Sequence, residues 1–294
     1  MALMIAHTSA PLGHELVGID LRTIDQPTFE ALDDAYRTYG VIVARGQSLS
    51  PRELVDFSKR FGQLLVYPLG NYLLEGFPEI FVVSNIVENG KPIGMKEAGA
   101  NWHTDMSFTT APPRGSILYA LEVPVQEGRT LGDTLFASGA AAYDDLSSAM
   151  KDRIEGLYAV NSASHAAKNK LERARERGTD DAELRARIER QAREFPDVVH
   201  PLVRRHPLTG RKCLYLSGDQ TCAIVGWDER SSTALLDELK EHYLSPQYTY
   251  RHTWRVGDVV FWDNCMCMHK AVQDYKLPLR RKMLRTTIAG WPTH

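Results

Sequence analysis

A histidine and a carboxylate lie two positions apart in this chain, at His103 and Asp105. In an extended backbone, residues i and i+2 point to the same side, so one ring nitrogen and one carboxylate oxygen could reach a single metal ion. Trp102 and Phe108 flank the pair with apolar bulk that would keep water away. His-x-Asp alone is a common chance motif, and a surface histidine near an acid is the alternative. A metal site therefore requires a further ligand elsewhere in the chain.

His269 is the best candidate for that ligand. It follows the apolar stretch 259–262 and a turn at Asp263-Asn264, which predicts a strand able to face the His-x-Asp segment. Two histidines and one carboxylate bind one face of an octahedral ion and leave the opposite positions open, which suits a non-haem Fe(II) that must admit a co-substrate and O2. A Zn-dependent hydrolase could use the same ligands. His252 is a weaker candidate, because no anion-binding residues are spaced after it.

Arg281 and Arg285 follow His269 by twelve and sixteen residues. Their even spacing places both on one side if this segment is a strand. A guanidinium grips a carboxylate by two hydrogen bonds, so one arginine could hold the far carboxylate of 2-oxoglutarate, with Thr134 adding a hydroxyl donor. The other could hold an acidic substrate. A solvated charge cluster on an edge strand is the alternative, and it explains the apolar surroundings of Arg285 poorly.

Cys265 and Cys267 lie beside His269 and raise the alternative of a soft-metal site, since thiolates favour Zn or Cu(I). Buried free cysteines usually act as small apolar residues, which is the interpretation we favour. The four cysteines of the chain do not make a disulfide framework, so a cytoplasmic location is expected.

Several motifs together resemble the taurine/dichlorophenoxyacetate dioxygenase family (TauD/TfdA). In chain order they are Trp102-His103-Thr104-Asp105, Gly132-Asp133-Thr134, Trp262-Asp263-Asn264 with His269, and Arg281 with Arg285. The similarity spans nearly the whole chain, from Val17 to Gly290. It implies one α+β domain over residues 1–294, with a double-stranded β-helix (jelly roll) core flanked by helices. It also implies Fe(II) as cofactor, with 2-oxoglutarate and O2 as co-substrates.

The resemblance assigns a role to each member of these motifs. His103, Asp105 and His269 would be the iron ligands and the catalytic centre. Thr134 and Arg281 would bind the distal carboxylate of 2-oxoglutarate.

Arg285 would bind the anionic group of the substrate, and Tyr67 and Met106 are expected beside it. The chain departs from the taurine enzyme where taurine is held. A histidine of that pocket is replaced by Tyr67, a tyrosine by Gly70, and an asparagine four residues before the first ligand by Gly99. We therefore expect another small organic acid, sulfonate or sulfate ester rather than taurine.

The implied reaction oxidises a small anionic substrate, by hydroxylation with or without bond cleavage, and yields succinate and CO2. Related halogenating enzymes lack the carboxylate found here at Asp105, so its presence favours oxygenation. Desaturation or another oxidative rearrangement is the alternative outcome. A Zn-dependent hydrolase and a non-enzymatic β-barrel binding module are more remote alternatives.

Composition agrees with a soluble globular protein, since 43% of the residues are hydrophobic and 24% are charged. The formal net charge of -2 points neither to nucleic acid nor to a membrane surface. We find no signal peptide and no apolar run near the roughly 20 residues that span a bilayer. The family also suggests a homo-oligomer.

The elements that must position the site are mostly short strands interrupted by helices. Helices are expected from Asp25 to Gly40, Ser50 to Gly62, Ser138 to Ile154 and Asp228 to Leu244. The strands between and after them favour a β-sandwich or barrel with helices packed outside. Residues 164–195 are dense in charge, which predicts solvated surface helices or a lid over the site.

Overall fold

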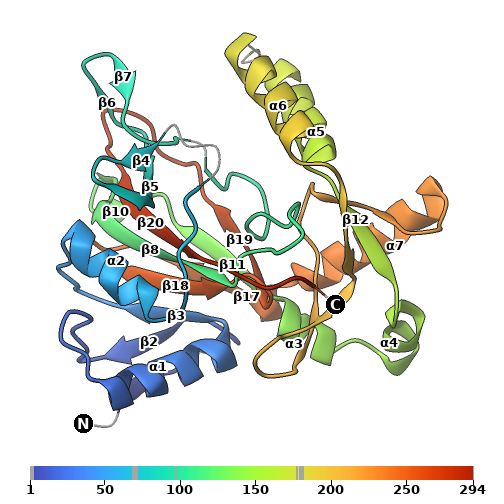
Figure 1. The fold of residues 1–294 in the computed structure, drawn as a ribbon, viewed down its shortest axis with the longest axis horizontal. Helices are drawn as coiled ribbons and strands as arrows, with labels where there is room; N and C mark the ends of the chain where they lie inside the picture. The colour runs from blue at the N-terminus through green and yellow to red at the C-terminus, as the bar shows by residue number, and fades with distance from the viewer. Residues whose placement is uncertain (1–2, 68–71, 97, 177, 179–181, 294) are drawn as a thin grey trace.

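A computed structural model describes residues 3–67, 72–96, 98–176, 178 and 182–293 of the chain (Figure 1). The helices are α1 (Gln26–Tyr39), α2 (Pro51–Lys59), α3 (Gly139–Asp144), α4 (Ser148–Ile154), α5 (Ala163–Glu176), α6 (Ala182–Glu194), α7 (Glu229–Tyr243) and the 3-10 turn η1 (Pro246–Tyr248). The first ten strands are β1 (Met4–Ala6), β2 (His14–Val17), β3 (Val41–Ala44), β4 (Leu73–Leu74), β5 (Phe77–Ser84), β6 (Val87–Glu88), β7 (Lys91–Pro92), β8 (Gly115–Glu122), β9 (Val125–Gln126) and β10 (Arg129–Thr130). The remaining ten are β11 (Thr134–Ser138), β12 (Tyr158–Asn161), β13 (Val198–Pro201), β14 (Val203–Arg205), β15 (Lys212–Leu214), β16 (Thr221–Ile224), β17 (Thr249–His252), β18 (Val259–Asp263), β19 (Cys267–Ala271) and β20 (Lys282–Ile288).

An eight-stranded sheet in the order β1-β2-β3-β18-β8-β20-β5-β4 forms the centre of the molecule. Its central strands are apolar on both faces because both faces are covered. Helices α1 and α2 pack on one face, where Phe29, Leu54 and Phe57 meet Phe261 and Leu284 in one buried cluster. Each helix begins where the sequence predicts, at a side chain that caps it and a proline in its first turn.

A three-stranded sheet in the order β17-β11-β19 packs toward the other face of the large sheet. Phe136 of β11 and Cys267 of β19 share a buried cluster with Trp262 of β18 and Met283 of β20. The space between the two sheets is therefore filled with apolar side chains. His269 lies on β19 of the three-stranded sheet, and Arg285 lies on β20 of the eight-stranded sheet.

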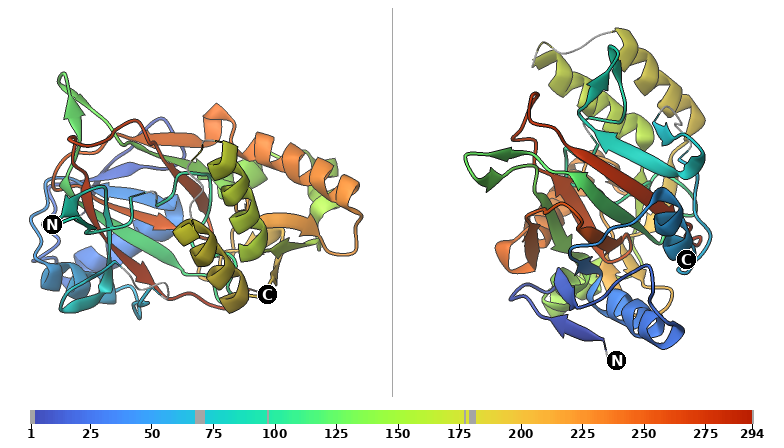
Figure 2. Two further views of the ribbon diagram at one scale, coloured as in Figure 1. Left: turned by 90° about the horizontal axis from the view of Figure 1, so that it is seen from above. Right: turned by 90° about the vertical axis from the view of Figure 1, so that its left-hand side faces the viewer.

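A second, smaller core lies beyond the three-stranded sheet, where α3 and α7 pack against a sheet in the order β13-β12-β16. Helices α5 and α6 form an antiparallel hairpin that projects away from the sheets (Figures 1 and 2). No helix among the described residues is long and apolar enough to cross a membrane.

The single helix expected from Ser138 to Ile154 is wrong in one respect, because the chain breaks there into α3 and α4. Ser147 starts the second helix by accepting a hydrogen bond from the backbone N–H of Met150. A serine that caps a new helix competes with continuation of the old one.

Candidate metal centre

The backbone itself brings the two histidines together. The N–H of His103 donates to the carbonyl of His269 at 3.0 Å, and the N–H of His269 donates back at 2.7 Å. This isolated antiparallel bridge lies beside β19 and holds the His-x-Asp segment against the three-stranded sheet. The two imidazole rings lie 4.1 Å apart between centroids. The fold therefore joins the two predicted histidines that are far apart in sequence.

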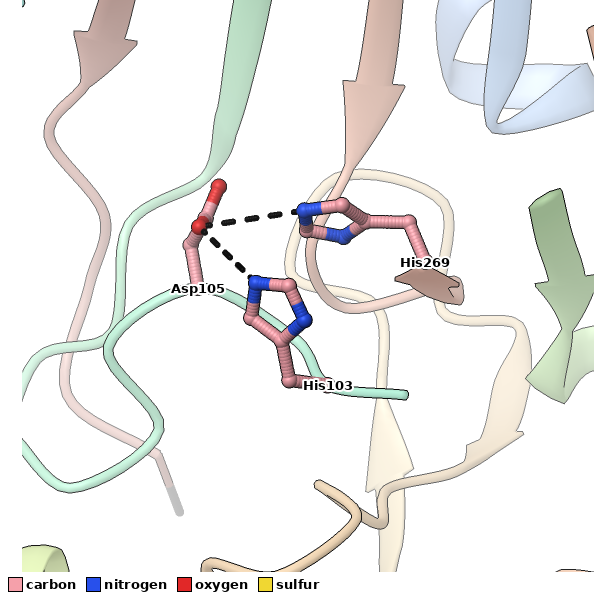
Figure 3. A group of neighbouring side chains, drawn as sticks. All are labelled: His103, Asp105 and His269. Atoms are coloured by element: carbon pink, nitrogen blue, oxygen red, sulfur yellow. Dashed lines mark ion pairs between the residues drawn. The ribbon is translucent and has the colours of Figure 1, made fainter. Parts of the chain in front are cut away.

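Asp105 completes the group. Its Oδ1 lies 3.7 Å from Nε2 of His103 and 3.9 Å from Nε2 of His269, and the three side chains point toward one another (Figure 3). These separations are too long for hydrogen bonds and suit groups that share an ion. Among the residues that the structure describes, this is the only group of three or more histidine, cysteine or acidic side chains arranged to hold a metal.

The tautomer of His103 is fixed by its surroundings. Its Nδ1 lies 2.8 Å from the carbonyl oxygen of Asn101, which can only accept a hydrogen bond. Nδ1 therefore carries the hydrogen, and Nε2 keeps its lone pair facing Asp105. Metal-binding histidines typically donate their other ring nitrogen in this way, so His103 fits the role of a ligand.

Asp105 is buried and yet ionised. Ser116 donates to Oδ2 at 2.7 Å, and Arg285 donates to Oδ1 at 3.1 Å. Burial acts to raise the pKa of Asp105, but the charge of Arg285, the two histidines and the Ser116 hydrogen bond hold it well below its usual range. The carboxylate is thus available as an anionic metal ligand.

His269 is neutral for a related reason. Its ring is enclosed by Trp262, 4.7 Å away between centroids, and by Phe136 at 6.1 Å. Burial, followed by the electrostatic influence of the adjacent His103 ring, lowers the pKa of His269 well below its usual value. A neutral imidazole is the form that binds metal.

Arg281 has the character of an anion-binding residue. It is buried, its Nε has no hydrogen-bond partner, and no acidic side chain in the described ranges forms an ion pair with it. Its guanidinium instead lies 5.9 Å from the ring of Trp254 and 6.0 Å from that of Tyr275. Burying an unpaired charge is costly, so this arrangement fits a carboxylate ligand supplied from outside the chain.

Trp254 contacts both Arg281 and Thr134. The indole Nε1 donates to the Thr134 hydroxyl at 3.0 Å, which leaves the hydroxyl hydrogen free to be donated elsewhere. Trp254 therefore contacts both residues that the sequence assigned to the distal carboxylate of 2-oxoglutarate.

Arg285 occupies a different position from the one expected of a purely substrate-binding residue, because it contacts the metal-site carboxylate of Asp105 directly. Its guanidinium also lies 5.4 Å from the Tyr67 ring and 5.1 Å from the Phe81 ring, and its Nε is unpartnered. Tyr67 is thus brought to Arg285 as the sequence predicted.

Met106 follows Asp105 in a left-handed backbone conformation with φ of 49°, and its carbonyl closes a turn by accepting from Thr109. Gly99 packs against the ring of His103, where an added Cβ would lie 3.2 Å from Cε1. Gly70 lies outside the described residues.

The alternative ligands have other partners. His252 is buried with Nε2 3.2 Å from Asp258 and is not part of the metal group. The thiol of Cys267 donates to the carbonyl of Asp263 at 3.1 Å, and burial raises its pKa, which disfavours a metal-binding thiolate.

Three further residues were not found from the sequence, namely Ser116, Asn101 and Trp254. They act through a hydroxyl, a backbone carbonyl and an indole N–H, and none of these groups has a characteristic spacing from the residue it supports. Ser116 lies on β8, whereas Asn101 and Trp254 lie outside the strands, and the contacts of all three are evident only in the folded chain.

Residues 5–287 match the family model described as "Taurine catabolism dioxygenase TauD, TfdA family". The chain is 35% identical over 283 residues to the pentalenolactone F synthase of Streptomyces arenae, which covers 95% of this chain and 92% of that protein. It is 33% identical over 264 residues to the alpha-ketoglutarate-dependent 2,4-dichlorophenoxyacetate dioxygenase of Burkholderia sp. (strain RASC), covering 85% and 82%. The crystal structure of AAD-2 in complex with Mn(II) and N-oxalylglycine matches with a TM-score of 0.78 at 29% identity, covering 100% of both chains. These matches extend over nearly all of the fold that carries the metal centre, and the chain belongs to the TauD/TfdA family of dioxygenases.

Proposed function

We propose that this Fe(II)- and 2-oxoglutarate-dependent dioxygenase oxidises a small anionic organic molecule other than taurine. One observation supports this above all others. Three metal-ligating side chains meet in one group, and a buried arginine of the same chain, Arg281, has no acidic partner among the described residues. A Zn-dependent hydrolase would have no use for that arginine, and a binding module would have no use for the ligands.

In this proposal His103, Asp105 and His269 hold the iron. When bound, iron and 2-oxoglutarate together activate O2 for oxidation of the substrate, with release of succinate and CO2. The surrounding residues prepare the ligands. Ser116 and Arg285 keep Asp105 ionised, and the carbonyl of Asn101 keeps the lone pair of His103 on the metal side.

Thr134 and Arg281 bind the distal carboxylate of 2-oxoglutarate. A buried guanidinium can grip a carboxylate by two charge-assisted hydrogen bonds, and the Thr134 hydroxyl can add a third. Trp254 orients this pair by donating to the Thr134 hydroxyl and by lying against Arg281.

Arg285 meets the anionic group of the substrate, and Tyr67 and Met106 are assigned to the same binding site. The aromatic rings of Tyr67 and Phe81 flank the guanidinium, which favours an anion with an apolar body. Replacement of polar pocket residues by Tyr67, Gly70 and Gly99 argues against an amino sulfonate. One relative is named for 2,4-dichlorophenoxyacetate, a carboxylate with a chlorinated aromatic body, and this chemistry agrees. Carboxylates, sulfonates and sulfate esters are therefore the substrate classes to test.

The larger features of the family are proposed on the same basis. The eight-stranded and three-stranded sheets together would form its double-stranded β-helix within a single domain of residues 1–294. The hairpin within residues 164–195 would act as a lid. Assembly into a homo-oligomer and a cytoplasmic location stay predictions.

The experiment is succinate formation by the Fe(II)-loaded protein against a panel of aryloxy acids, alkyl sulfonates and sulfate esters. We expect succinate to rise with at least one apolar anion and to stay near background with taurine. Arg280→Ala serves as a control, since Arg280 is exposed and paired with Glu122. Succinate formation stimulated only by taurine, or turnover that needs neither 2-oxoglutarate nor O2, would contradict the proposal.

A further inference from the structure

The loop from Ser217 to Gln220 lies directly against the segment that carries the metal ligands. The Ser217 hydroxyl accepts from the N–H of Thr104 at 3.1 Å and lies 3.3 Å from the Thr104 carbonyl. Gly218 has φ of 37°, and a Cβ at that position would lie 1.8 Å from the carbonyl oxygen of Trp102. Thr104 separates His103 from Asp105, so this loop fixes the backbone of both ligands.

The same loop is attached to the helical hairpin. The N–H of Ser162, which precedes α5, donates to the carbonyl of Gln220 at 2.8 Å. Arg173, three turns along α5, forms an ion pair of 2.5 Å with Oδ2 of Asp219. Directly after α6, at the base of the hairpin, the ring of Phe195 lies 4.9 Å from that of Phe108. The hairpin therefore contacts both the loop and the ligand segment.

Asp219 is where these contacts meet. Its Oδ2 accepts from Arg173 of the hairpin and, at 3.4 Å, from the side-chain amide of Asn101. The backbone carbonyl of Asn101 in turn accepts from Nδ1 of His103 at 2.8 Å. One carboxylate oxygen thus lies between a helix of the hairpin and the residue that orients a metal ligand.

We propose that Asp219 is a positioning residue that couples the α5–α6 hairpin to His103 through Asn101. When Arg173 is in contact, the carboxylate is held at the place where Asn101 can donate to it, and the His103 ring keeps its orientation. When the hairpin moves away, Asp219 loses that restraint and Asn101 loses its acceptor. Metal binding and closure of the hairpin consequently favour each other, as linkage requires.

The size of this coupling follows from exposure. Arg173 and Asp219 are 32% and 30% exposed, and ion pairs near the surface are worth little. We expect each partner to change the other equilibrium by about two- to fivefold. The coupling rests on the proposed metal centre, so the test must separate the two.

The test is amide hydrogen exchange of α5 in the full-length protein with and without Mn(II), with Mn(II) binding measured in parallel by calorimetry. In the wild type, Mn(II) should slow exchange in α5 by about two- to fivefold. Asp219→Ala and Arg173→Ala should each remove that slowing. Arg153→Ala is the matched control, because it removes an exposed ion pair with Glu238 elsewhere, and it should keep the slowing.

Asp219→Asn separates the two contacts of the carboxylate. It keeps an oxygen that can accept from Asn101 but loses the charge that holds Arg173, so Mn(II) should no longer slow exchange in α5 and should bind about two- to fivefold more weakly than in wild type. If wild-type protein binds Mn(II) without slower exchange in α5, or if Asp219→Ala retains the slowing, the coupling is wrong. If wild-type protein does not bind Mn(II) at all, the metal centre itself is wrong.

Discussion

Asp105 has more partners than any other member of the metal centre. Its two oxygens accept hydrogen bonds from Ser116 and Arg285, and the carboxylate also faces two histidines. Ser116, Arg285 and His269 are buried. Such support matters because a ligand carboxylate must stay ionised and oriented before the metal arrives. Ser116, which no sequence motif suggested, is therefore as much a part of the site as its better-known neighbours.

Ser116→Ala should weaken Mn(II) or Fe(II) binding by about ten- to a hundredfold, because the carboxylate loses the donor that fixes Oδ2. Calorimetric titration measures the change. Ser58→Ala is the matched control, since Ser58 is also fully buried but bonds to Thr286 between α2 and β20. Equal losses of metal affinity in the two variants would mean that Ser116 acts only on stability.

The two buried arginines should be separable by substitution. Arg281→Ala should weaken 2-oxoglutarate binding by about ten- to a hundredfold, the value of one charged hydrogen-bonded contact, and leave metal affinity unchanged. Arg285→Ala should lower the affinity for the substrate by a similar factor. It should also lower the affinity for the metal, because the hydrogen bond from Arg285 to Asp105 is lost. Arg280→Ala, which removes an exposed arginine next to Arg281, should change none of the three.

The readouts are separate titrations of metal, 2-oxoglutarate and substrate. Loss of 2-oxoglutarate binding in Arg285→Ala alone would reverse the assignment of the two arginines. Loss of metal affinity in Arg281→Ala would mean that Arg281 supports the ligands instead of binding a co-substrate.

The sequence singled out His103, Asp105 and His269 by residue type and spacing, and the structure brings the three together. The roles assigned to them and to the two arginines stay predictions. The sequence did not predict that Arg285 bonds to Asp105. That contact depends on β20 pairing with β8, so that position 285 faces the layer between the sheets, and no local pattern encodes that pairing.

Helix boundaries depend on local chemistry and could be read from the sequence in most cases. Asp25 and Ser50 accept hydrogen bonds from the first turns of α1 and α2, and each is followed by a proline within the first turn. The break between α3 and α4 was missed because no proline or glycine marks it. Ser147 caps α4 by the same chemistry, but it also fits the interior of a longer helix.

Ser50→Ala should lower the free energy of unfolding by about 1 kcal/mol, because the N–H of Glu53 loses its acceptor while Glu53 still bonds to the backbone of residue 50. Urea denaturation measures the difference. Ser245→Ala is the control, since Ser245 precedes the turn η1 without a side-chain cap and its loss should cost under about 0.5 kcal/mol. An equal cost at both positions would show that the capping bond adds nothing.

The arrangement of the whole chain was predictable as a class but not as a topology. Alternating apolar strands favoured packed sheets with outer helices. The neighbours of β18, however, are β3 and β8, which come from distant parts of the chain, and apolar periodicity does not name such partners. The high density of charged residues in 164–195 predicted the two helices of the hairpin, because solvent-exposed helix faces are rich in charged side chains.

Burial of neutral histidines throughout the fold sets how stability depends on pH. Burial, the largest influence in each case, lowers the pKa of His14, His200 and His252 below the usual value. The unfolded chain therefore takes up protons that the folded chain does not. The stability contributed by each neutral ring is present above its unfolded pKa of about 6.5 and is lost as pH falls toward the folded pKa, by about 1.4 kcal/mol for each unit of lowering.

His252 allows this effect to be isolated. Its ring lies in the core against Trp254 at 4.5 Å between centroids, and the carboxylate of Asp258, 3.2 Å from Nε2, only partly offsets the effect of burial on its pKa. His252→Gln should destabilise the metal-free protein more at pH 8 than at pH 5, because the wild type loses the histidine's contribution on acidification and the variant has none to lose. Urea midpoints at the two pH values measure the gap, and His165→Gln on the exposed side of α5 should leave it unchanged. If the difference in stability between wild type and His252→Gln instead grows toward pH 5, then Asp258 stabilises His252 as a cation, and folding raises the pKa of His252 instead of lowering it.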